Sequence, residues 1–320
     1  MQDDLRGSGG MRVLITGSQG FIGTYLCRAL QEKNIDFLGC DLGLGGQGDY
    51  MQADVIRSEE IGLAFENFRP THVFHLAGEV GRYHGEEFPH RCVSTNLTGT
   101  LNVIRNCLKY KSILYFASSS EIYGDASWPL GEFTKRGEIL NVYGLSKWQA
   151  EEWIGHYIRR CGLKAVILRF FNIYGPGEVP NYYRSAMANF IYRTLTGKRI
   201  EVHEGTARSW CYIDDLIKCL FLLLNHKVRR GDWGKQIYNI GCNELAYMVQ
   251  LARTIAKLSG RITPIKVVKR GPLDVKVKNP SFASVEKTIG WKASTSLAEG
   301  VEKTIEWQKD TFGIGGNAKL

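Results

Sequence analysis

The sequence lacks the features that mark secreted and membrane proteins. Its longest apolar run, residues 220–224, is far too short to cross a bilayer. The opening residues, MQDDLRGSGG, are polar and acidic, whereas a signal peptide needs basic and then apolar residues. Eight cysteines occur without a Cys-x-x-Cys pair, which favours buried, reduced thiols over a disulfide framework or a zinc site. We therefore expect a cytoplasmic protein with no membrane association and no bound metal.

Composition and charge narrow the class of protein only a little. The 320 residues are 44% hydrophobic and 23% charged, as is usual for a soluble globular chain. The net charge is +9, spread along the chain apart from a cluster at residues 266–278. Such a charge suits nucleic acid, and it equally suits a ligand that carries phosphates. Charge alone does not choose between them.

Short apolar runs alternate with amphipathic stretches through the first half of the chain, and this pattern predicts an α/β fold. Strands alternating with helices indicate a parallel sheet covered by helices on both faces. The predicted strands are residues 11–17, 35–41, 71–78, 112–120 and 164–170, and the predicted helices are residues 21–33, 93–108 and 143–160.

After residue 169 the alternation weakens and the loops lengthen, which suggests a second, smaller region of mixed structure. We expect a flexible leader, a dinucleotide-binding domain, a smaller substrate-binding region and a flexible tail. Their bounds are 1–10 for the leader, 11–170 for the first domain with 213–244 returning to it, 171–212 and 245–310 for the smaller region, and 311–320 for the tail.

The stretch GSQGFIG lies between a predicted strand and a predicted helix, where Gly17, Gly20 and Gly23 suit a dinucleotide-binding turn. Glycine permits the tight turn, the approach of a pyrophosphate to bare backbone, and close helix–strand packing. Asp41 ends the second strand, where a carboxylate binds an adenosine ribose and disfavours a 2′-phosphate, so NAD is favoured over NADP. Asp54 and Val55 are candidates for holding the adenine, with a surface turn as the alternative. The turn indicates a doubly wound sheet of the Rossmann type.

Tyr143 and Lys147 form the chain's one Tyr-x-x-x-Lys pair. On a helix these positions share one face, so the ammonium can stabilise a phenolate. Tyr143 would then remove a proton near neutral pH. The alternative is a solvated pair on a helix surface.

With these motifs in place, the chain resembles the extended short-chain dehydrogenase/reductase family, in its branch of nucleotide-sugar epimerases, dehydratases and decarboxylases. The resemblance covers residues 11–308. Its motifs are GSQGFIG, HLAG, the serine-rich strand end with its Tyr-Gly, YGLSK, RFFNIYGPG, RSWCYIDDL and RGPLD.

The resemblance implies that NAD stays bound and that a sugar hydroxyl at C4 is oxidised first. Tyr143 would take the hydroxyl proton, Ser119 would hydrogen-bond the same oxygen, and Lys147 would also bind the nicotinamide ribose. Phe21 and Ile22 of the turn would contact the cofactor, as would Leu76, Ala77 and Gly78 of HLAG.

Four residues stand where the family grips the nucleotide diphosphate: Asn172, Asn189, Arg208 and Arg270. A guanidinium suits this task because its planar fork pairs with two phosphate oxygens. The alternatives are turn or capping roles for the asparagines and solvated charges for the arginines.

Glu121 follows the three serines of the strand end and raises the question of which reaction is catalysed. A carboxylate there can remove the C5 proton of a C4 ketone, so we expect a 4,6-dehydratase with Glu121 as base and Ser120 beside it. Two alternatives stay open, a UDP-sugar 4-epimerase and a UDP-glucuronate decarboxylase. The decarboxylase pattern has an arginine where Lys278 stands, which counts against that reaction without excluding it.

The segment GRYHGEEFPHR would lie over the sugar, with Arg82, Tyr83 and His84 in contact with it or on a surface loop. The insertion EVPNYYRS, residues 178–185, would also shape this pocket. The resemblance favours UDP as the nucleotide and a homodimer. A non-enzymatic alternative, an RNA-binding or NAD-sensing protein of the same fold, has only the positive charge in its favour, and we expect no nucleic-acid partner.

Overall fold

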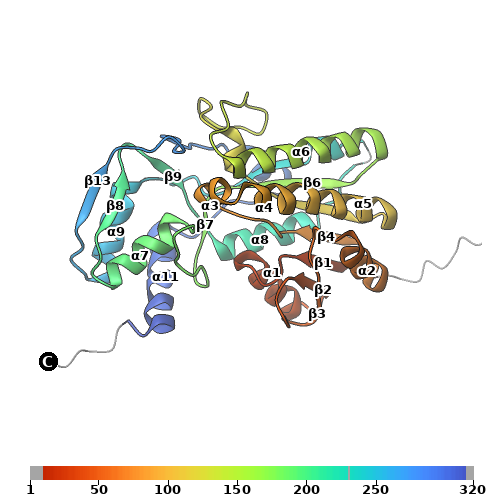
Figure 1. Ribbon diagram of the computed structural model, residues 1–320, viewed down its shortest axis with the longest axis horizontal. Coiled ribbons are helices and arrows are strands. Elements are labelled where there is room, and N and C mark those ends of the chain that lie inside the picture. Colours follow the sequence, from red (N-terminus) through yellow and green to blue (C-terminus); the bar gives the residue numbers. More distant parts are fainter. Residues whose placement is uncertain (1–9, 230, 315–320) are drawn as a thin grey trace, which may run out of the picture.

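A computed structural model describes residues 10–229 and 231–314. At its centre lies a seven-stranded parallel sheet in the order β11-β6-β5-β4-β1-β2-β3 (Figure 1). The order reverses beside β1, which is the doubly wound arrangement, so the predicted Rossmann-type fold is confirmed. The strands are β1 (Arg12–Thr16), β2 (Asp36–Asp41), β3 (Asp49–Gln52), β4 (His72–His75), β5 (Ile113–Ser119), β6 (Ala165–Phe170) and β11 (Ile237–Ile240).

Strands β3 and β11 extend the sheet beyond the five strands that the apolar runs predicted. β3 is a four-residue edge strand, and none of its side chains is fully buried. Its sequence, DYMQ, therefore lacks the apolar run that marks the central strands.

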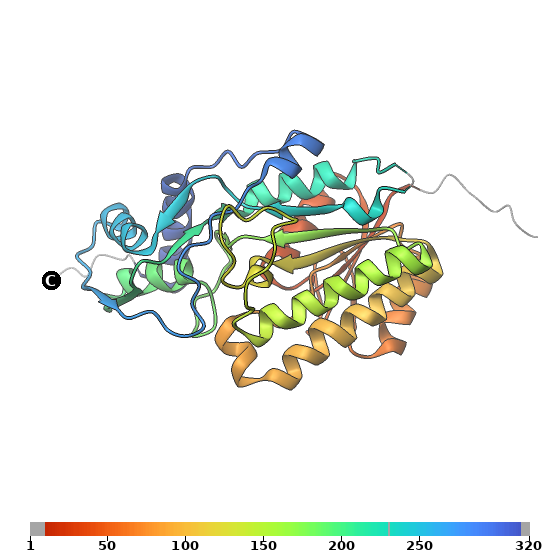
Figure 2. The same ribbon diagram turned by 90° about the horizontal axis from the view of Figure 1, so that it is seen from above.

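Helices cover the sheet on both faces (Figure 2). Helices α1 (Phe21–Glu32) and α8 (Ile213–Leu224) pack in one core with Val13 and Ile15 of β1. Helices α2 (Ser58–Phe68), α5 (Thr100–Tyr110) and α6 (Val142–Cys161) pack in the other with Leu14. Adjacent side chains of a strand point to opposite faces, so a strand covered on both faces reads as a continuous apolar run.

The helix predicted at 93–108 differs from the prediction. It begins earlier as α4 (Pro89–Val93), widens into a π-helical turn at η1 (Ser94–Gly99) and continues as α5. Buried Asn96 in the wide turn donates to the Glu79 carbonyl oxygen (3.0 Å) and to Ser146 Oγ of α6 (2.9 Å). This turn is stabilised by contacts across the fold that hydrophobic periodicity does not show.

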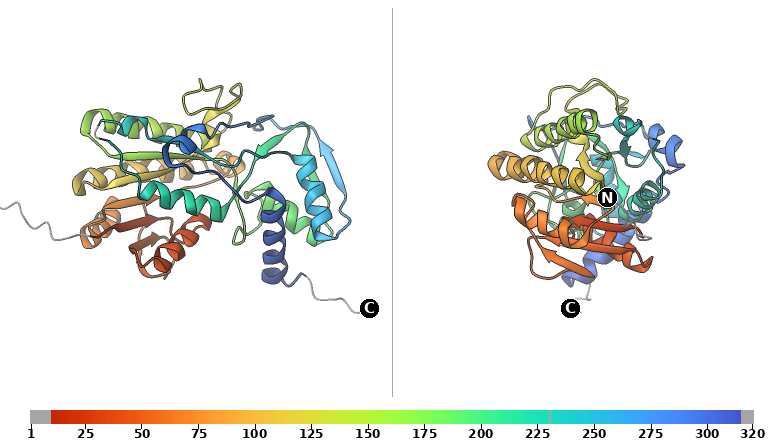
Figure 3. Two further views of the ribbon diagram at one scale, coloured as in Figure 1. Left: turned by 180° about the vertical axis from the view of Figure 1, so that it is seen from behind. Right: turned by 90° about the vertical axis from the view of Figure 1, so that its right-hand side faces the viewer.

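A second region packs at one end of the sheet (Figures 1 and 3). Its main elements are helices α7 (Ala186–Leu195), α9 (Met248–Ser259) and α11 (Leu297–Phe312), and three two-stranded sheets. The sheets are β7 (Ile173–Tyr174) with β10 (Cys211–Tyr212), β8 (Ile200–His203) with β13 (Ile265–Val268), and β9 (Ala207–Ser209) with β12 (Leu245–Tyr247). The elements of the whole chain that have not yet been named are α3 (Arg82–Glu87), α10 (Ala283–Ile289), η2 (Ser120–Tyr123) and η3 (Trp233–Lys235).

The predicted domain bounds stay a prediction, although α8 and β11, from residues 213–244, do belong to the sheet and its helices. Helix α11 runs to Phe312, so the predicted tail does not begin at residue 311. Most of the predicted leader and tail, residues 1–9 and 315–320, lie outside the described residues. None of the helices within 10–229 and 231–314 combines the length and apolar character needed to cross a bilayer.

A buried polar network fastens α6 to the sheet. Glu151 of α6 pairs with Arg169 of β6 at 2.7 Å, with side chains 6% and 9% exposed. Glu151 also accepts a hydrogen bond from Ser118 at the end of β5, and Arg169 donates to the Tyr123 hydroxyl at 2.9 Å. Removing one partner of such a pair leaves a buried charge uncompensated.

We expect Glu151→Ala to lower the free energy of unfolding by about 3–5 kcal/mol, because Arg169 would then lie buried without its partner. Urea denaturation at neutral pH measures this change. The control is Arg199→Ala, which breaks an exposed pair with Glu201 and should change stability by no more than about 0.5 kcal/mol. Equal effects of the two variants would contradict the assigned role of the buried pair.

Candidate active site

A cavity of about 1310 Å³ opens at the carboxyl ends of the strands and extends into the second region. In doubly wound sheets this edge is where ligands bind. One half of the cavity is lined by the turn after β1 and the end of β2. The other half is lined by α7, β8 and β9. The cavity is therefore large enough for two ligands that meet near the end of β5.

The glycine-rich turn after β1 presents bare backbone to the cavity. Gly17 has φ 77°, and a Cβ atom built on it would lie 2.5 Å from the backbone nitrogen of Ala77. A Cβ atom on Gly23 would lie 2.2 Å from the carbonyl oxygen of Gly17. Gly20 caps the N-terminus of α1, whose free backbone N–H groups favour anions. The turn therefore fits the pyrophosphate of a dinucleotide.

Asp41 lies at the end of β2 beside this turn. Its two carboxylate oxygens accept hydrogen bonds from the backbone nitrogens of Gln19 and Leu42, each at 2.8 Å. The side chain is thus held at the cavity wall. The other residues that we predicted to contact the cofactor also line the cavity: Phe21, Ile22, Asp54, Val55, Leu76, Ala77, Gly78 and Lys147.

Tyr143 and Lys147 lie in the first turns of α6, where Asn141 caps the helix by accepting from Gly144 N. Both side chains are buried and both line the cavity. Burial raises the pKa of Tyr143, and its hydrogen bond with Ser119 only partly offsets this. Burial lowers the pKa of Lys147 to about 8, while Cys92 and Glu151 act to raise it.

Burial therefore opposes the ionisation of Tyr143 in the protein alone. The prediction that Tyr143 removes a proton near neutral pH considered only the charge of Lys147 and left out the cost of burying an ionised phenol. It stays a prediction for the protein with its cofactor bound.

The serines at the end of β5 have different partners. Ser118 donates to Glu151 in the buried network, and Ser119 Oγ accepts from the backbone nitrogen of Glu121 at 3.2 Å. Ser119 also hydrogen-bonds Tyr143, and Ser120 begins η2. All three serines line the cavity. The end of β5 therefore connects the buried network of Glu151 and Arg169, through Ser118, with the cavity around Tyr143, through Ser119.

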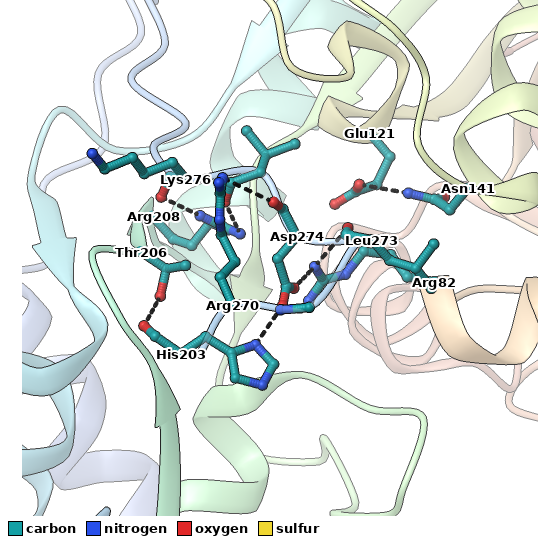
Figure 4. A network of polar contacts seen from close by, with 12 residues as sticks. Arg82, Glu121, Asn141, His203, Thr206, Arg208, Arg270, Leu273, Asp274 and Lys276 are labelled. Carbon is teal, nitrogen blue, oxygen red and sulfur yellow. Dashed lines mark hydrogen bonds and ion pairs between the residues drawn. The ribbon is translucent and has the colours of Figure 1, made fainter. Parts of the chain in front are cut away.

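Glu121 is bonded through both carboxylate oxygens. Oε1 lies 2.5 Å from Nζ of Lys278, which is only 1% exposed. Oε2 accepts from Asn141 Nδ2 at 3.1 Å, a contact that Figure 4 shows. Burial alone would raise the pKa of Glu121, but Lys278, Arg82 and Arg208 together lower it to about 2. Glu121 is therefore an ionised carboxylate, and each of its two oxygens already accepts from one donor.

Asp274 organises a second group of charges that was not predicted (Figure 4). Its Oδ1 pairs with Arg82 of α3, and its Oδ2 lies 2.5 Å from Nδ1 of His203 at the end of β8. Arg82 also donates to the Leu273 carbonyl oxygen at 3.2 Å. These contacts join α3 to the second region across the cavity.

Arg208 and Arg270 donate to backbone carbonyls rather than to carboxylates. Arg208 donates to Ala207 and Val275, each at 2.8 Å, and Arg270 donates to Asp274 O at 3.2 Å. Burial lowers the pKa of Arg208 to about 10, which still leaves it charged. Within the described part of the chain, neither guanidinium has a carboxylate partner in an ion pair. Arg208 lines the cavity, so its charge is available to an anionic ligand.

The other predicted substrate residues have mixed positions. Tyr83, Asn172 and Asn189 line the cavity. Both asparagines use their amide groups on backbone, Asn172 toward Ser209 O (2.8 Å) and Asn189 toward three carbonyls that include Asn181 O (2.8 Å). Of the described residues, Arg270, Lys278 and His84 are not among those that line it, and Lys278 lies behind Glu121.

Several cavity residues were missed by the sequence analysis: Glu178, His203, Trp210 and Asp274. Glu178 stands in the insertion that we expected to shape the pocket, so a signal existed. Asp274 ends the RGPLD motif and Trp210 lies in RSWCYIDDL, so the motifs that we recognised contained a signal for both. His203 belongs to no such motif, and the fold brings it to Asp274.

Comparison with known proteins gives the family. Residues 13–241 match the model of the NAD dependent epimerase/dehydratase family. UDP-glucuronate 4-epimerase 2 of Arabidopsis thaliana is 28% identical over 93% of this chain and 75% of its own length. UDP-glucuronic acid decarboxylase 6 of the same plant is 29% identical over 91% and 87%. A solved UDP-glucose 4-epimerase of Thermus thermophilus in complex with NAD has 27% identity and a TM-score of 0.84, over 93% of this chain and 98% of that one.

The chain belongs to the NAD-dependent epimerase/dehydratase family, as the extended short-chain dehydrogenase/reductase resemblance predicted. Its cofactor is NAD, which the bare turn and the carboxylate of Asp41 fit.

The ion pair of Glu121 makes stability depend on pH in a defined direction. The pKa of Glu121 is about 2 in the folded chain, against an ordinary value of 4.5 for a glutamate side chain. A depressed carboxyl pKa stabilises the fold above the unfolded value, and this contribution is lost as the pH falls toward the folded value. Between pH 5 and pH 3 we expect wild type to lose about 1–2 kcal/mol more free energy of unfolding than Glu121→Gln. Urea denaturation at both pH values measures the difference, and Glu306→Gln, at an exposed position, is the control. Parallel losses in wild type and Glu121→Gln would contradict the assigned pairing.

Proposed function

We propose that the protein oxidises C4 of a UDP-sugar and later returns the hydride, and that its substrate is UDP-glucuronate. The observation that carries the proposal is the meeting of Ser119, Tyr143 and Lys147 in the same cavity as the dinucleotide turn. UDP-glucuronate is favoured because an epimerase and a decarboxylase of this sugar are both among the relatives.

The residues have distinct roles in this proposal. Tyr143 removes the proton of the C4 hydroxyl, Ser119 hydrogen-bonds the same oxygen, and Lys147 binds the nicotinamide ribose as an ammonium. Arg208 holds the diphosphate, since it lines the cavity and has no carboxylate partner among the described residues. Arg270 does not line the cavity, and its contact with the diphosphate rests on the resemblance alone. When bound, oxidised NAD supplies a hydride acceptor and a positively charged ring that favours the phenolate. Tyr143 and Ser119 then hold the C4 oxygen while the ketone exists.

The bonding of Glu121 counts against a 4,6-dehydratase. A base at C5 needs a free lone pair and a pKa near the working pH. Glu121 has Lys278 on one oxygen and Asn141 on the other, and its pKa is about 2. The expectation of a 4,6-dehydratase depended on Glu121 as the base at C5, and these contacts do not favour that role.

Decarboxylation is the reaction that this arrangement supports best. Once C4 of a uronic acid is a ketone, C6 can leave as CO2 without a base at C5. The electron pair of the C5–C6 bond passes to the C4 oxygen as an enolate, C5 then takes a proton from water, and the hydride returns to C4. An ionised Glu121 in the cavity wall repels a second carboxylate and does not repel CO2, so its charge favours the departure. The lysine that replaces the arginine of the decarboxylase pattern is still a cation, and its task is to keep Glu121 ionised.

Epimerisation at C4 is the second candidate, and one observation favours it. A Glu121 that is fixed by two donors leaves C5 untouched, as simple inversion at C4 requires. For a uronic acid the site would then have to hold the C6 carboxylate beside an ionised Glu121.

The remaining predictions also stay proposals. We infer a homodimer through α5 and α6, because Leu145 and Trp153 of α6 are 39% and 42% exposed. We infer a cytoplasmic location because the cysteines are unpaired thiols. An RNA-binding role without catalysis is disfavoured by the complete Ser119, Tyr143 and Lys147 set.

Incubation of the purified protein with UDP-glucuronate and NAD, followed by mass spectrometry, separates the reactions. Decarboxylation predicts a product lighter by one CO2. Epimerisation predicts an isomer of unchanged mass, and dehydration predicts the loss of water from a UDP-hexose offered in parallel. The proposed substrate would be contradicted if NAD-loaded protein converted another nucleotide sugar and left UDP-glucuronate unchanged.

Tyr143→Phe removes the hydroxyl that takes the substrate proton and leaves the ring in place. We expect kcat to fall by about 100-fold or more, with NAD and UDP still bound. Calorimetric titration with UDP checks that the cavity is intact. Turnover at the wild-type rate would contradict the role of Tyr143.

Glu121→Gln separates the two candidate reactions. It should slow CO2 release by about tenfold or more if the carboxylate drives decarboxylation, and it should leave epimerisation nearly unchanged. In Glu121→Gln the buried ammonium of Lys278 loses its carboxylate partner. The double variant Glu121→Gln/Lys278→Gln also removes that ammonium and so controls for this effect. Fast CO2 release by both variants would contradict a part for the Glu121 charge.

A further inference from the structure

The loop between β7 and α7 brings one acidic side chain to the cavity that the proposed reaction does not use. Glu178 lines the cavity and is only 7% exposed. Its Oε2 accepts a hydrogen bond from Ser185 Oγ at 2.8 Å. Across residues 10–229 and 231–314, no lysine or arginine forms an ion pair with it. A buried carboxyl group facing a ligand cavity without a paired cation calls for a physical explanation.

The loop lies against the end of α1 that takes the dinucleotide phosphates. The Tyr25 hydroxyl of α1 donates to the carbonyl oxygen of Pro176 at 2.9 Å. A Cβ atom built on Gly177 would contact the rings of Tyr25 and Phe21 at 3.6 and 3.7 Å. Phe21 is the first residue of α1, directly after the glycine-rich turn. The backbone that leads into Glu178 therefore lies against the dinucleotide half of the cavity, while its hydrogen-bond partner Ser185 caps α7 on the other side.

An ionised carboxylate at this place would be costly twice. It would be buried without a salt bridge, and it would face the negative charge of a bound pyrophosphate. The neutral acid avoids both costs, and its O–H group can donate a hydrogen bond to a ligand oxygen. Burial raises the pKa of Glu178 to about 7, while Ser185 and Arg184 act to lower it.

The other charged and titratable groups around the loop do not offset the cost of an ionised Glu178. They are Arg184 on the loop itself, Tyr25 and Arg28 on α1, and Asp214 on α8, which acts to raise the pKa of Tyr25. Asp214 adds negative charge to this side of the loop. The largest change of charge near Glu178 therefore comes with the ligand.

We propose that Glu178 is a cofactor-binding residue that acts as the neutral acid, donating a hydrogen bond to an oxygen of the dinucleotide, so that binding of NAD takes up a proton. This proposal depends on the cofactor of the family and not on the sugar reaction. Its test needs no turnover and can fail while the proposed function stands.

The sign of the pH dependence follows from linkage. In the free protein, Glu178 is ionised above about pH 7. If NAD binds the neutral acid more tightly than the carboxylate, binding raises the pKa of this carboxyl group and takes up protons, so affinity falls as the pH rises. For each unit by which bound NAD raises this pKa, Kd weakens by up to about tenfold between low and high pH.

Calorimetric titration of the full-length protein, freed of cofactor, with NAD tests the proposal. Repeating it at pH 7.5 in two buffers of different ionisation enthalpy gives the number of protons taken up. We expect wild type to take up more protons than Glu178→Gln, and its Kd to weaken by about tenfold between pH 6 and pH 9. Glu178→Gln, which is neutral at every pH, should bind with the wild-type low-pH affinity and lack this component. Glu306→Gln, an exposed substitution on α11, should behave as wild type, and any contribution of Lys147 is common to all three proteins.

A second variant keeps the test decisive if Glu178→Gln folds poorly. Ser185→Ala removes the hydrogen bond that lowers the pKa of Glu178, so the midpoint of the pH dependence should move to higher pH. The proposal is overturned if Glu178→Gln and wild type show the same proton uptake and the same pH dependence. It is also overturned if they differ only when UDP is titrated into NAD-loaded protein, because the acceptor would then belong to the nucleotide sugar.

Discussion

The buried contact of Glu151 with Arg169 and Ser118 is the constraint on which the site depends. It ties α6 to the ends of β5 and β6 below the cavity. Because Glu151 lies one turn after Lys147 on the same helix face, a fixed Glu151 fixes Lys147 and, one turn earlier, Tyr143. Ser118 is in the network and Ser119 is in the site, so adjacent residues of one strand join the two. The geometry of the phenol relative to the strand end is therefore set by a contact that never meets a ligand.

The second organising feature is the distribution of charge in the substrate half of the cavity. Two carboxylates are each paired with a cation, Glu121 with Lys278 and Asp274 with Arg82. Arg208, which lines the cavity, has no carboxylate partner among the described residues and keeps its charge for a ligand. This sorting has a chemical consequence, because a carboxylate kept ionised by buried cations is a poor base. Lys278 lies behind Glu121, so the negative end of this pair faces the cavity. The preference for decarboxylation over dehydration follows from the partners of Glu121 and not from its position alone.

The sequence predicted those parts of the site that local chain geometry determines. The glycine turn and the Tyr143 and Lys147 pair are short-range patterns, and the fold places both where they were expected. It could not show that Glu121 is paired, since Lys278 lies 157 residues away along the chain. Nor could it show how strongly burial opposes the ionisation of Tyr143, because burial is a property of the whole fold. The π-helical turn before α5 and the group around Asp274 likewise depend on contacts between distant segments. Where a residue's neighbours in space are its neighbours in sequence, prediction succeeded.

The central claim is that the protein removes a hydride from C4 of a nucleotide sugar and later gives it back. Rapid mixing of NAD-loaded protein with UDP-glucuronate, followed through the absorbance of reduced nicotinamide, tests it most directly. The account predicts that the reduced cofactor rises and then decays as product forms, and that Tyr143→Phe shows almost no rise. Product formation by wild type with no reduced nicotinamide at any time, under conditions that would detect one tenth of the bound cofactor, would contradict it.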